Sequence, residues 1–112
     1  HSLESYRENI KGSDILIFQA HPYRKRLKRA DPALLDGVEV MNGNPRHESH
    51  NDLAFDFASK HGLMMIAGSD SHQPEDVGRG GIWICDSISS SIELASWMKK
   101  NNPLDMYIPK LI

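Results

Sequence analysis

Two strand-like segments of the sequence end in residue types that can ligate a metal ion. The apolar run at 64–67 leads to Asp70 and His72, and the segment at 14–20 leads to His21. Two residues that are two positions apart in an extended segment project to the same side. A carboxylate oxygen and an imidazole nitrogen placed there could reach one metal ion or two adjacent ions. The alternative is that Asp70 caps a turn and the histidines lie on the surface.

Strand-like and helical patterns alternate along the chain, and these elements would position the candidate ligands. We expect strands at 14–20, 37–42, 63–68 and 80–85. We expect helices at 3–10, 46–61 and 90–100, and a short helical turn at 31–36. This alternation predicts an α/β fold with a mainly parallel sheet flanked by helices. Functional groups in such folds collect at the carboxyl ends of the strands, which is where the candidate ligands fall.

Capping residues mark several of the expected helix ends. Asp31 followed by proline is typical of a helical start, and Gly62 is typical of the stop after the helix at 46–61. Ser90 can cap the last helix while Glu93, three residues later, reaches back. These signals make the helix at 46–61 the best defined element of the sequence.

Composition fits one domain spanning residues 1–112, with 39% hydrophobic and 25% charged residues. A formal charge of -2 argues against a chain that coats nucleic acid or an anionic membrane. The single cysteine, Cys85, excludes an internal disulfide framework, suits the cytoplasm, and is expected to be buried and inert. No apolar stretch is long enough to span a membrane, so we expect no membrane partner.

Three segments, taken in order, resemble motifs of the PHP domain, the polymerase and histidinol phosphatase family: "AHPYR" at 20–24, "GVEVMN" at 37–42 and "AGSDSH" at 67–72. The resemblance implies a distorted (β/α)7 TIM-like barrel. It also implies two or three divalent metal ions, zinc, manganese or iron, at the carboxyl end of the strands. Such an enzyme hydrolyses phosphate esters through a metal-activated water.

On this resemblance, His21, Asp70 and His72 match metal ligands, and Asp70 and His72 also take part in catalysis. Glu39 and Asn42 match motif positions without being clear ligands, and they are candidates for supporting or substrate contacts.

The chain departs from the PHP pattern because no His-x-His motif or further ligand precedes residue 20. We therefore expect the C-terminal half of a PHP domain, completed by a missing N-terminal segment or by a second copy of the chain. The isolated chain should bind metal weakly and be a poor catalyst.

A basic run, "RKRLKR" at 24–29, follows His21 directly. Arg24 lies nearest the expected ligand, and its guanidinium suits a phosphate, so it is a third candidate catalytic residue. A solvated loop explains the rest of the run. His47 and His50 are three apart and could share a helix face at the rim of the site.

The sequence thus predicts a metal-dependent phosphoesterase acting on a phosphorylated small molecule. Two alternatives stay open. One is a non-catalytic PHP-like module that binds another chain, and the other is a PHP-type exonuclease whose partner is nucleic acid.

Overall fold

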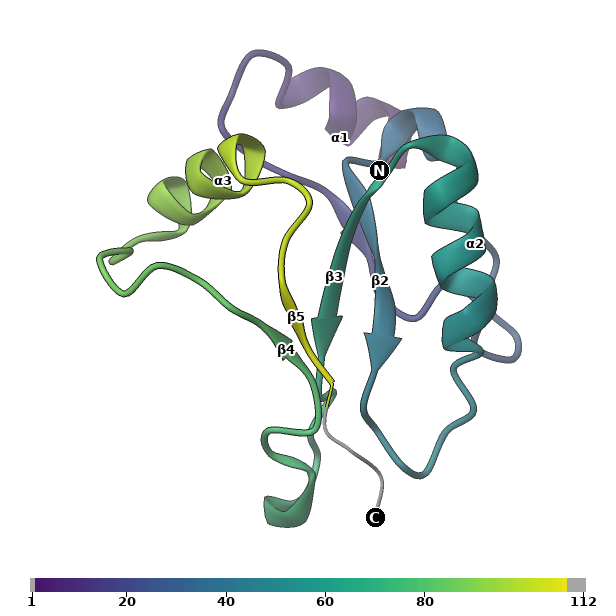
Figure 1. Cartoon of the computed structure of the whole chain (residues 1–112). Coiled ribbons are helices and arrows are strands. Elements are labelled where there is room, and N and C mark those ends of the chain that lie inside the picture. Colours follow the sequence, from purple (N-terminus) through teal and green to yellow (C-terminus); the bar gives the residue numbers. More distant parts are fainter. Residues whose placement is uncertain (1, 109–112) are drawn as a thin grey trace.

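The computed structural model describes residues 2–108. Residue 1 and residues 109–112 of the expected domain lie outside the described part. The elements in chain order are α1 Leu3–Asn9, β1 Phe18–Gln19, the 3₁₀ turn η1 Pro32–Leu34, β2 Gly37–Asn42, α2 Asn51–His61, β3 Met64–Gly68, the 3₁₀ turn η2 Pro74–Asp76, β4 Gly81–Ile82, α3 Ser91–Lys100 and β5 Met106–Tyr107. Figure 1 shows β2 and β3 at the centre, with α2 on one side and α3 with the β4–β5 pair on the other.

The first sheet is parallel and has the order β1-β2-β3, which confirms the expected α/β class with a parallel sheet. Phe18 pairs with Gly37, and Val38 pairs with Met65. A Cβ atom at Gly37 would lie 2.4 Å from the Phe18 ring and 2.5 Å from the Met64 carbonyl oxygen. Glycine therefore lets the three strands approach each other at the start of β2.

Helix α2 covers one face of this sheet and forms the core with it (Figure 1). Val38 and Val40 alternate along β2 and are buried, and Ala54 and Ala58 of α2 pack against them. Small alanine side chains allow the helix to lie close to the strands. The helix ends at Gly62 with φ 62°, so the predicted stop is confirmed.

The expected fourth parallel strand at 80–85 is wrong. Only Gly81–Ile82 is a strand, and it pairs antiparallel with β5 in a separate two-stranded sheet. Trp83, just beyond β4, makes an edge contact with Tyr107 at 5.9 Å between ring centroids. No closed barrel forms from the described residues, because the two sheets do not join.

The expected strand at 14–20 is also shorter than predicted, since only its last part is paired as β1. Helix α1 ends at Asn9. The helical turn at 31–36 is confirmed as η1, with the Asp31 side chain accepting from the backbone of Ala33.

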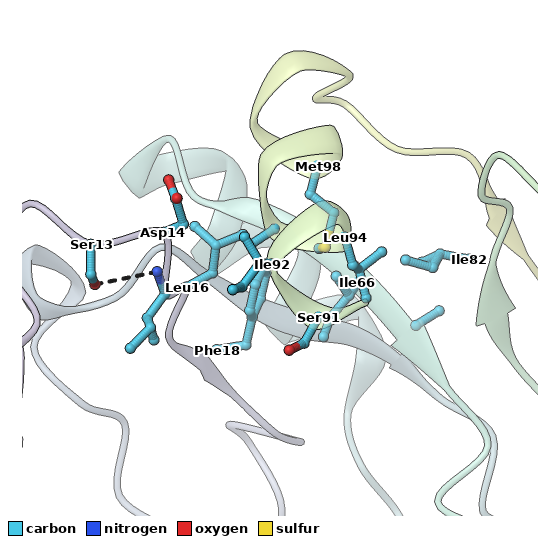
Figure 2. Close-up of a pocket in the computed structure, with 13 residues that line it drawn as sticks. Ser13, Asp14, Leu16, Phe18, Ile66, Ile82, Ser91, Ile92, Leu94 and Met98 are labelled. Carbon is cyan, nitrogen blue, oxygen red and sulfur yellow. Dashed lines mark hydrogen bonds between the residues drawn. The ribbon is translucent and has the colours of Figure 1, made fainter. Parts of the chain in front are cut away.

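Helix α3 begins as predicted, with the Ser90 hydroxyl accepting a hydrogen bond from the Glu93 backbone N–H at 3.1 Å. The Glu93 carboxylate reaches back to the backbone N–H of Ser89 at 2.9 Å, one residue earlier than expected. Between α3 and the sheet lies an apolar cavity of about 780 Å³. Figure 2 shows Phe18, Ile66 and Met98 among its lining residues.

Candidate functional site

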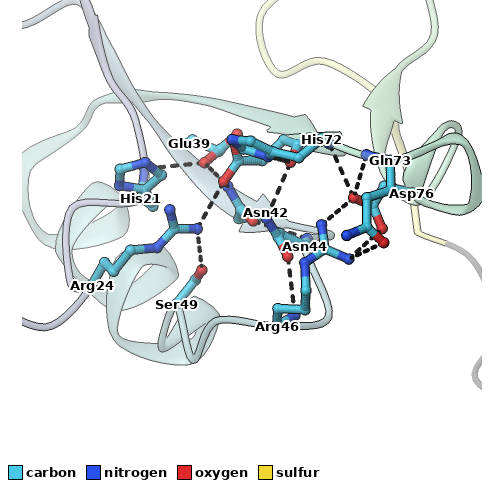
Figure 3. Close-up of polar contacts among 11 residues, drawn as sticks. His21, Arg24, Glu39, Asn42, Asn44, Arg46, Ser49, His72, Gln73 and Asp76 are labelled. Carbon is cyan, nitrogen blue, oxygen red and sulfur yellow. Dashed lines mark hydrogen bonds and ion pairs between the residues drawn. The ribbon is translucent and has the colours of Figure 1, made fainter.

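The polar residues of interest gather where β1, β2 and β3 end, an edge of the sheet that we call the carboxyl edge. His21 follows β1, Asn42 is the last residue of β2, and Asp70 follows β3. Because the three strands are parallel, their carboxyl ends lie side by side. Figure 3 shows the hydrogen bonds and ion pairs that join these residues.

Asp70 lies at the centre of this network. Arg24 donates to its Oδ2 at 2.9 Å, and Asn42 Nδ2 donates to the same oxygen at 3.2 Å. Burial raises the pKa of the Asp70 carboxyl. The hydrogen bonds from Arg24 and Asn42 outweigh that effect, so the pKa falls below its ordinary value. Asp70 is therefore an anion at neutral pH.

Arg24 is held between two loops. Its guanidinium donates to Asp70 and also to the hydroxyl of Ser49 at 3.0 Å, while its Nε is buried without a hydrogen-bond partner among the described residues. The rest of the basic run, residues 25–29, is exposed, in keeping with a solvated loop. Arg24 thus differs from the other cations of the run because it faces the site.

Glu39 and Asn42 connect the strand ends. The Oε1 atom of Glu39 accepts from the backbone N–H of His21 at 3.0 Å and from Asn42 Nδ2 at 2.8 Å. Asn42 therefore bridges the carboxylates of Glu39 and Asp70. Both residues thus belong to the polar network at the carboxyl edge.

His21 has a left-handed backbone with φ 28°, and its Nδ1 is buried without a hydrogen-bond partner among residues 2–108. A non-glycine residue in this region is uncommon and marks a constrained position. The Glu39 bond to its backbone N–H helps to fix that conformation.

His72 approaches Asp70 through a turn rather than through an extended segment. Asp70 has φ 50°, so the expected extended geometry is wrong. The turn places His72 Nδ1 2.9 Å from the Asp70 carbonyl oxygen and 3.9 Å from Asp70 Oδ1. The imidazole is otherwise largely exposed.

Four further residues of this region were not expected from the sequence: Asn44, Arg46, Ser49 and Asp76. All four lie in the loops that follow β2 and β3. The polar "NGN" at 42–44 is a turn signal that could have drawn attention to Asn44. Nothing in the sequence indicates that Arg46 and Asp76, which are 30 residues apart, form an ion pair.

Two expectations about other residues are wrong. His47 and His50 do not share a helix face, because α2 starts at Asn51 and His50 has a left-handed φ of 50°. Cys85 is exposed rather than buried, because β4 ends at Ile82 and the chain leaves the sheet before reaching it. Its thiol lies 2.9 Å from the Ser87 hydroxyl.

The donor types suit a divalent ion, but they do not complete a site. His21 offers a buried ring nitrogen without a partner, and both Arg24 and Asn42 bind Oδ2 of Asp70, leaving Oδ1 toward His72. Within residues 2–108, no three His, Cys, Asp or Glu side chains are grouped so that they could hold a metal ion.

Comparison with protein families gives one match. Residues 48–102 match the family described as PHP-associated. Over these residues the chain is similar to the PHP-associated family. This match confirms the relationship to PHP domains that the sequence motifs indicated.

The PHP-associated segment contains Asp70 and His72, whereas His21, Arg24 and Glu39 precede it. The carboxyl edge is thus shared between the matched segment and the part of the chain before it. Neither the curated proteins nor the solved structures gave a match. None of the helices within residues 2–108 has the length and apolar character needed to cross a membrane.

Proposed function

We propose that this chain supplies part of the active site of a PHP-type, metal-dependent phosphoester hydrolase. The supporting observation is the position of Asp70. It is an anionic carboxylate at the carboxyl edge of a parallel sheet, with His72 Nδ1 3.9 Å from its Oδ1, in a chain related to PHP domains. Functional groups of parallel α/β folds collect at this edge.

In this proposal His21, Asp70 and His72 hold divalent metal ions, zinc, manganese or iron. A bound ion of this kind lowers the pKa of a water ligand and neutralises charge on a phosphoryl group. The hydrogen bonds from Arg24 and Asn42 keep Asp70 ionised and fixed in orientation. The Arg24 guanidinium also makes the edge more favourable for the phosphoryl oxygens of a small-molecule substrate.

The remaining ligands come from other polypeptide, because the described residues do not group three ligating side chains. Either a preceding segment or a second copy of this chain would supply them. The proposal therefore predicts weak metal binding by residues 1–112 alone and tighter binding when the partner polypeptide is present.

Metal titration tests the proposal directly. Isothermal titration of Mn²⁺ and of Zn²⁺ is carried out on the 112-residue chain and on its Asp70→Asn variant. We expect the variant to lose affinity by about tenfold or more, since a carboxylate ligand becomes a neutral amide. The matched control is Asp36→Asn, because Asp36 also pairs with an arginine, Arg7 at 2.7 Å, but lies away from the carboxyl edge. Equal affinity of Asp70→Asn and wild type would refute the assignment.

Hydrolysis separates the proposed enzyme from its alternatives. The chain with its partner polypeptide is assayed on p-nitrophenyl phosphate and on single-stranded DNA. Preference for the small ester supports the proposal. Preference for DNA favours an exonuclease, which the exposed basic residues at 25–29 beside His21 would suit. Absence of both metal binding and hydrolysis would leave a binding module.

A further inference from the structure

A bidentate ion pair lies beside the proposed site, between the segments that follow β2 and β3. Arg46 Nη1 donates to Asp76 Oδ1 at 2.9 Å, and Arg46 Nη2 donates to Asp76 Oδ2. The Asp76 side chain is 0% exposed, whereas that of Arg46 is 39% exposed. A buried carboxylate is strongly unfavourable unless its oxygens are fully paired. The pair therefore fixes where the two segments meet.

The same carboxylate binds the backbone at His72. Asp76 Oδ2 accepts the N–H of His72 at 3.0 Å and the N–H of Gln73 at 3.1 Å. Asp76, held by Arg46 on one side, thus anchors through these bonds the backbone of the residue that carries the exposed imidazole (Figure 3).

The other end of this connection reaches Asp70. Arg46 donates its backbone N–H to Asn44 Oδ1 at 3.0 Å, and Asn44 Nδ2 donates to the Asp70 carbonyl oxygen at 3.2 Å. That carbonyl oxygen also lies 2.9 Å from His72 Nδ1. A closed path of polar contacts therefore runs from Asp70 through Asn44, Arg46 and Asp76 to His72.

We infer that Arg46 and Asp76 are positioning residues that set the orientation of His72 relative to Asp70. This inference rests on the proposed function, since Asp70 and His72 are the proposed metal ligands. Neither Arg46 nor Asp76 needs to touch metal or substrate. Partners behind metal ligands fix the ligand geometry, and removing them weakens metal binding by about 10-fold to 100-fold in other sites.

The test compares two matched variants, Arg46→Gln and Arg7→Gln. Arg7 forms the same kind of bidentate pair with Asp36, at 2.7 and 3.1 Å, far from the site. Three quantities are measured by NMR and titration: hydrogen exchange of the His72 and Gln73 amides, the ring ¹⁵N shifts of His72, and Mn²⁺ affinity. Arg46→Lys, which keeps the positive charge but cannot form the bidentate pair, serves as the conservative variant.

We expect Arg46→Gln to speed exchange of the two amides by about tenfold, to shift the His72 ring resonances and to weaken Mn²⁺ binding by about tenfold. Arg46→Lys should recover part of each change. Arg7→Gln should lower the free energy of unfolding without moving the His72 resonances. If Arg46→Gln does not fold, Asp76→Asn takes its place, because it keeps the side-chain shape and one acceptor oxygen.

Two outcomes overturn the inference. In one, Arg46→Gln leaves the amides and ring of His72 as they are in the wild type. In the other, Arg7→Gln changes them equally, which shows a general effect of stability. If the wild type binds no Mn²⁺, the proposed function fails. The amide exchange and ring shifts still decide whether Arg46 and Asp76 position His72.

Discussion

The guanidinium of Arg24 donates to the carboxylate of Asp70 at 2.9 Å, although the two residues lie 46 positions apart in the sequence. The loop after β1 is thereby tied to the loop after β3. Both side chains are mostly buried, with 16% and 22% of their surfaces exposed. Removing one partner of an ion pair shielded in this way leaves the other charge partly desolvated and without its counter-charge.

Replacing Arg24 with Gln should therefore lower the free energy of unfolding by about 1–3 kcal/mol, because Asp70 loses a charged donor while it stays partly buried. Urea denaturation followed by circular dichroism measures the change. Lys25→Gln is the control, since Lys25 is an exposed member of the same run and should alter stability by less than about 0.5 kcal/mol. Similar losses in both variants would show that the net charge of the loop, rather than the pair, matters.

Acid should destabilise the protein partly through Asp36. Burial raises the pKa of this carboxyl, but hydrogen bonds from the Arg7 guanidinium and the Ile17 N–H outweigh it, so the folded pKa lies below the ordinary value. The unfolded pKa is about 3.9. The stabilisation is therefore fully present above that pH and is lost as pH falls through the folded pKa.

Asp36→Asn should accordingly lower stability at pH 7 and reduce the dependence of stability on pH below about 4. Urea unfolding at several pH values between about 2 and 7 gives the two curves. Asp86→Asn, at an exposed position, should leave the curve close to that of the wild type. If the stability of the Asp36→Asn protein depended on pH as steeply as that of the wild type, Asp36 would not be the source of this pH dependence.

Val38 is fully buried between the sheet and α2. Val38→Ala should cost about 1–3 kcal/mol, because two methyl groups are lost and the cavity collapses only in part. Val77→Ala is the same chemical change at a side chain that is 72% exposed, and it should have little effect. Chemical denaturation of both variants shows whether the loss of stability comes from the burial of the side chain or from the change of valine to alanine itself.

Ser90 caps α3 through the Glu93 N–H. Ser90→Ala should destabilise the protein by about 1 kcal/mol, whereas Ser90→Asp should keep the cap. Ser59→Ala, at an exposed position in the last turn of α2, should instead stabilise slightly through helix propensity. Thermal melts of the three variants give the order of their stabilities. A Ser90→Ala protein as stable as the wild type would show that the cap contributes nothing to stability.

Most helix ends and the two central strands can be predicted from local sequence signals. Glycine at position 62, aspartate at 31 and serine at 90 end or begin helices as predicted, because capping depends on residues within one turn. The strands at 37–42 and 64–68 followed from apolar runs bounded by glycine. The predictions of a fourth parallel strand and of a buried Cys85 were wrong, because an apolar run does not show which strand it will pair with or where the sheet ends.

For the candidate site, the sequence determined residue types at neighbouring strand ends: Asp70, Asn42 and Glu39. Their contacts follow from parallel strands whose ends lie at one edge. The pairing of Arg24 with Asp70 and the meeting of Arg46 and Asp76 beside His72 become visible only in the folded chain. These pairs join loops across 30 and 46 residues. Loop conformation and packing, rather than local spacing, bring such side chains together.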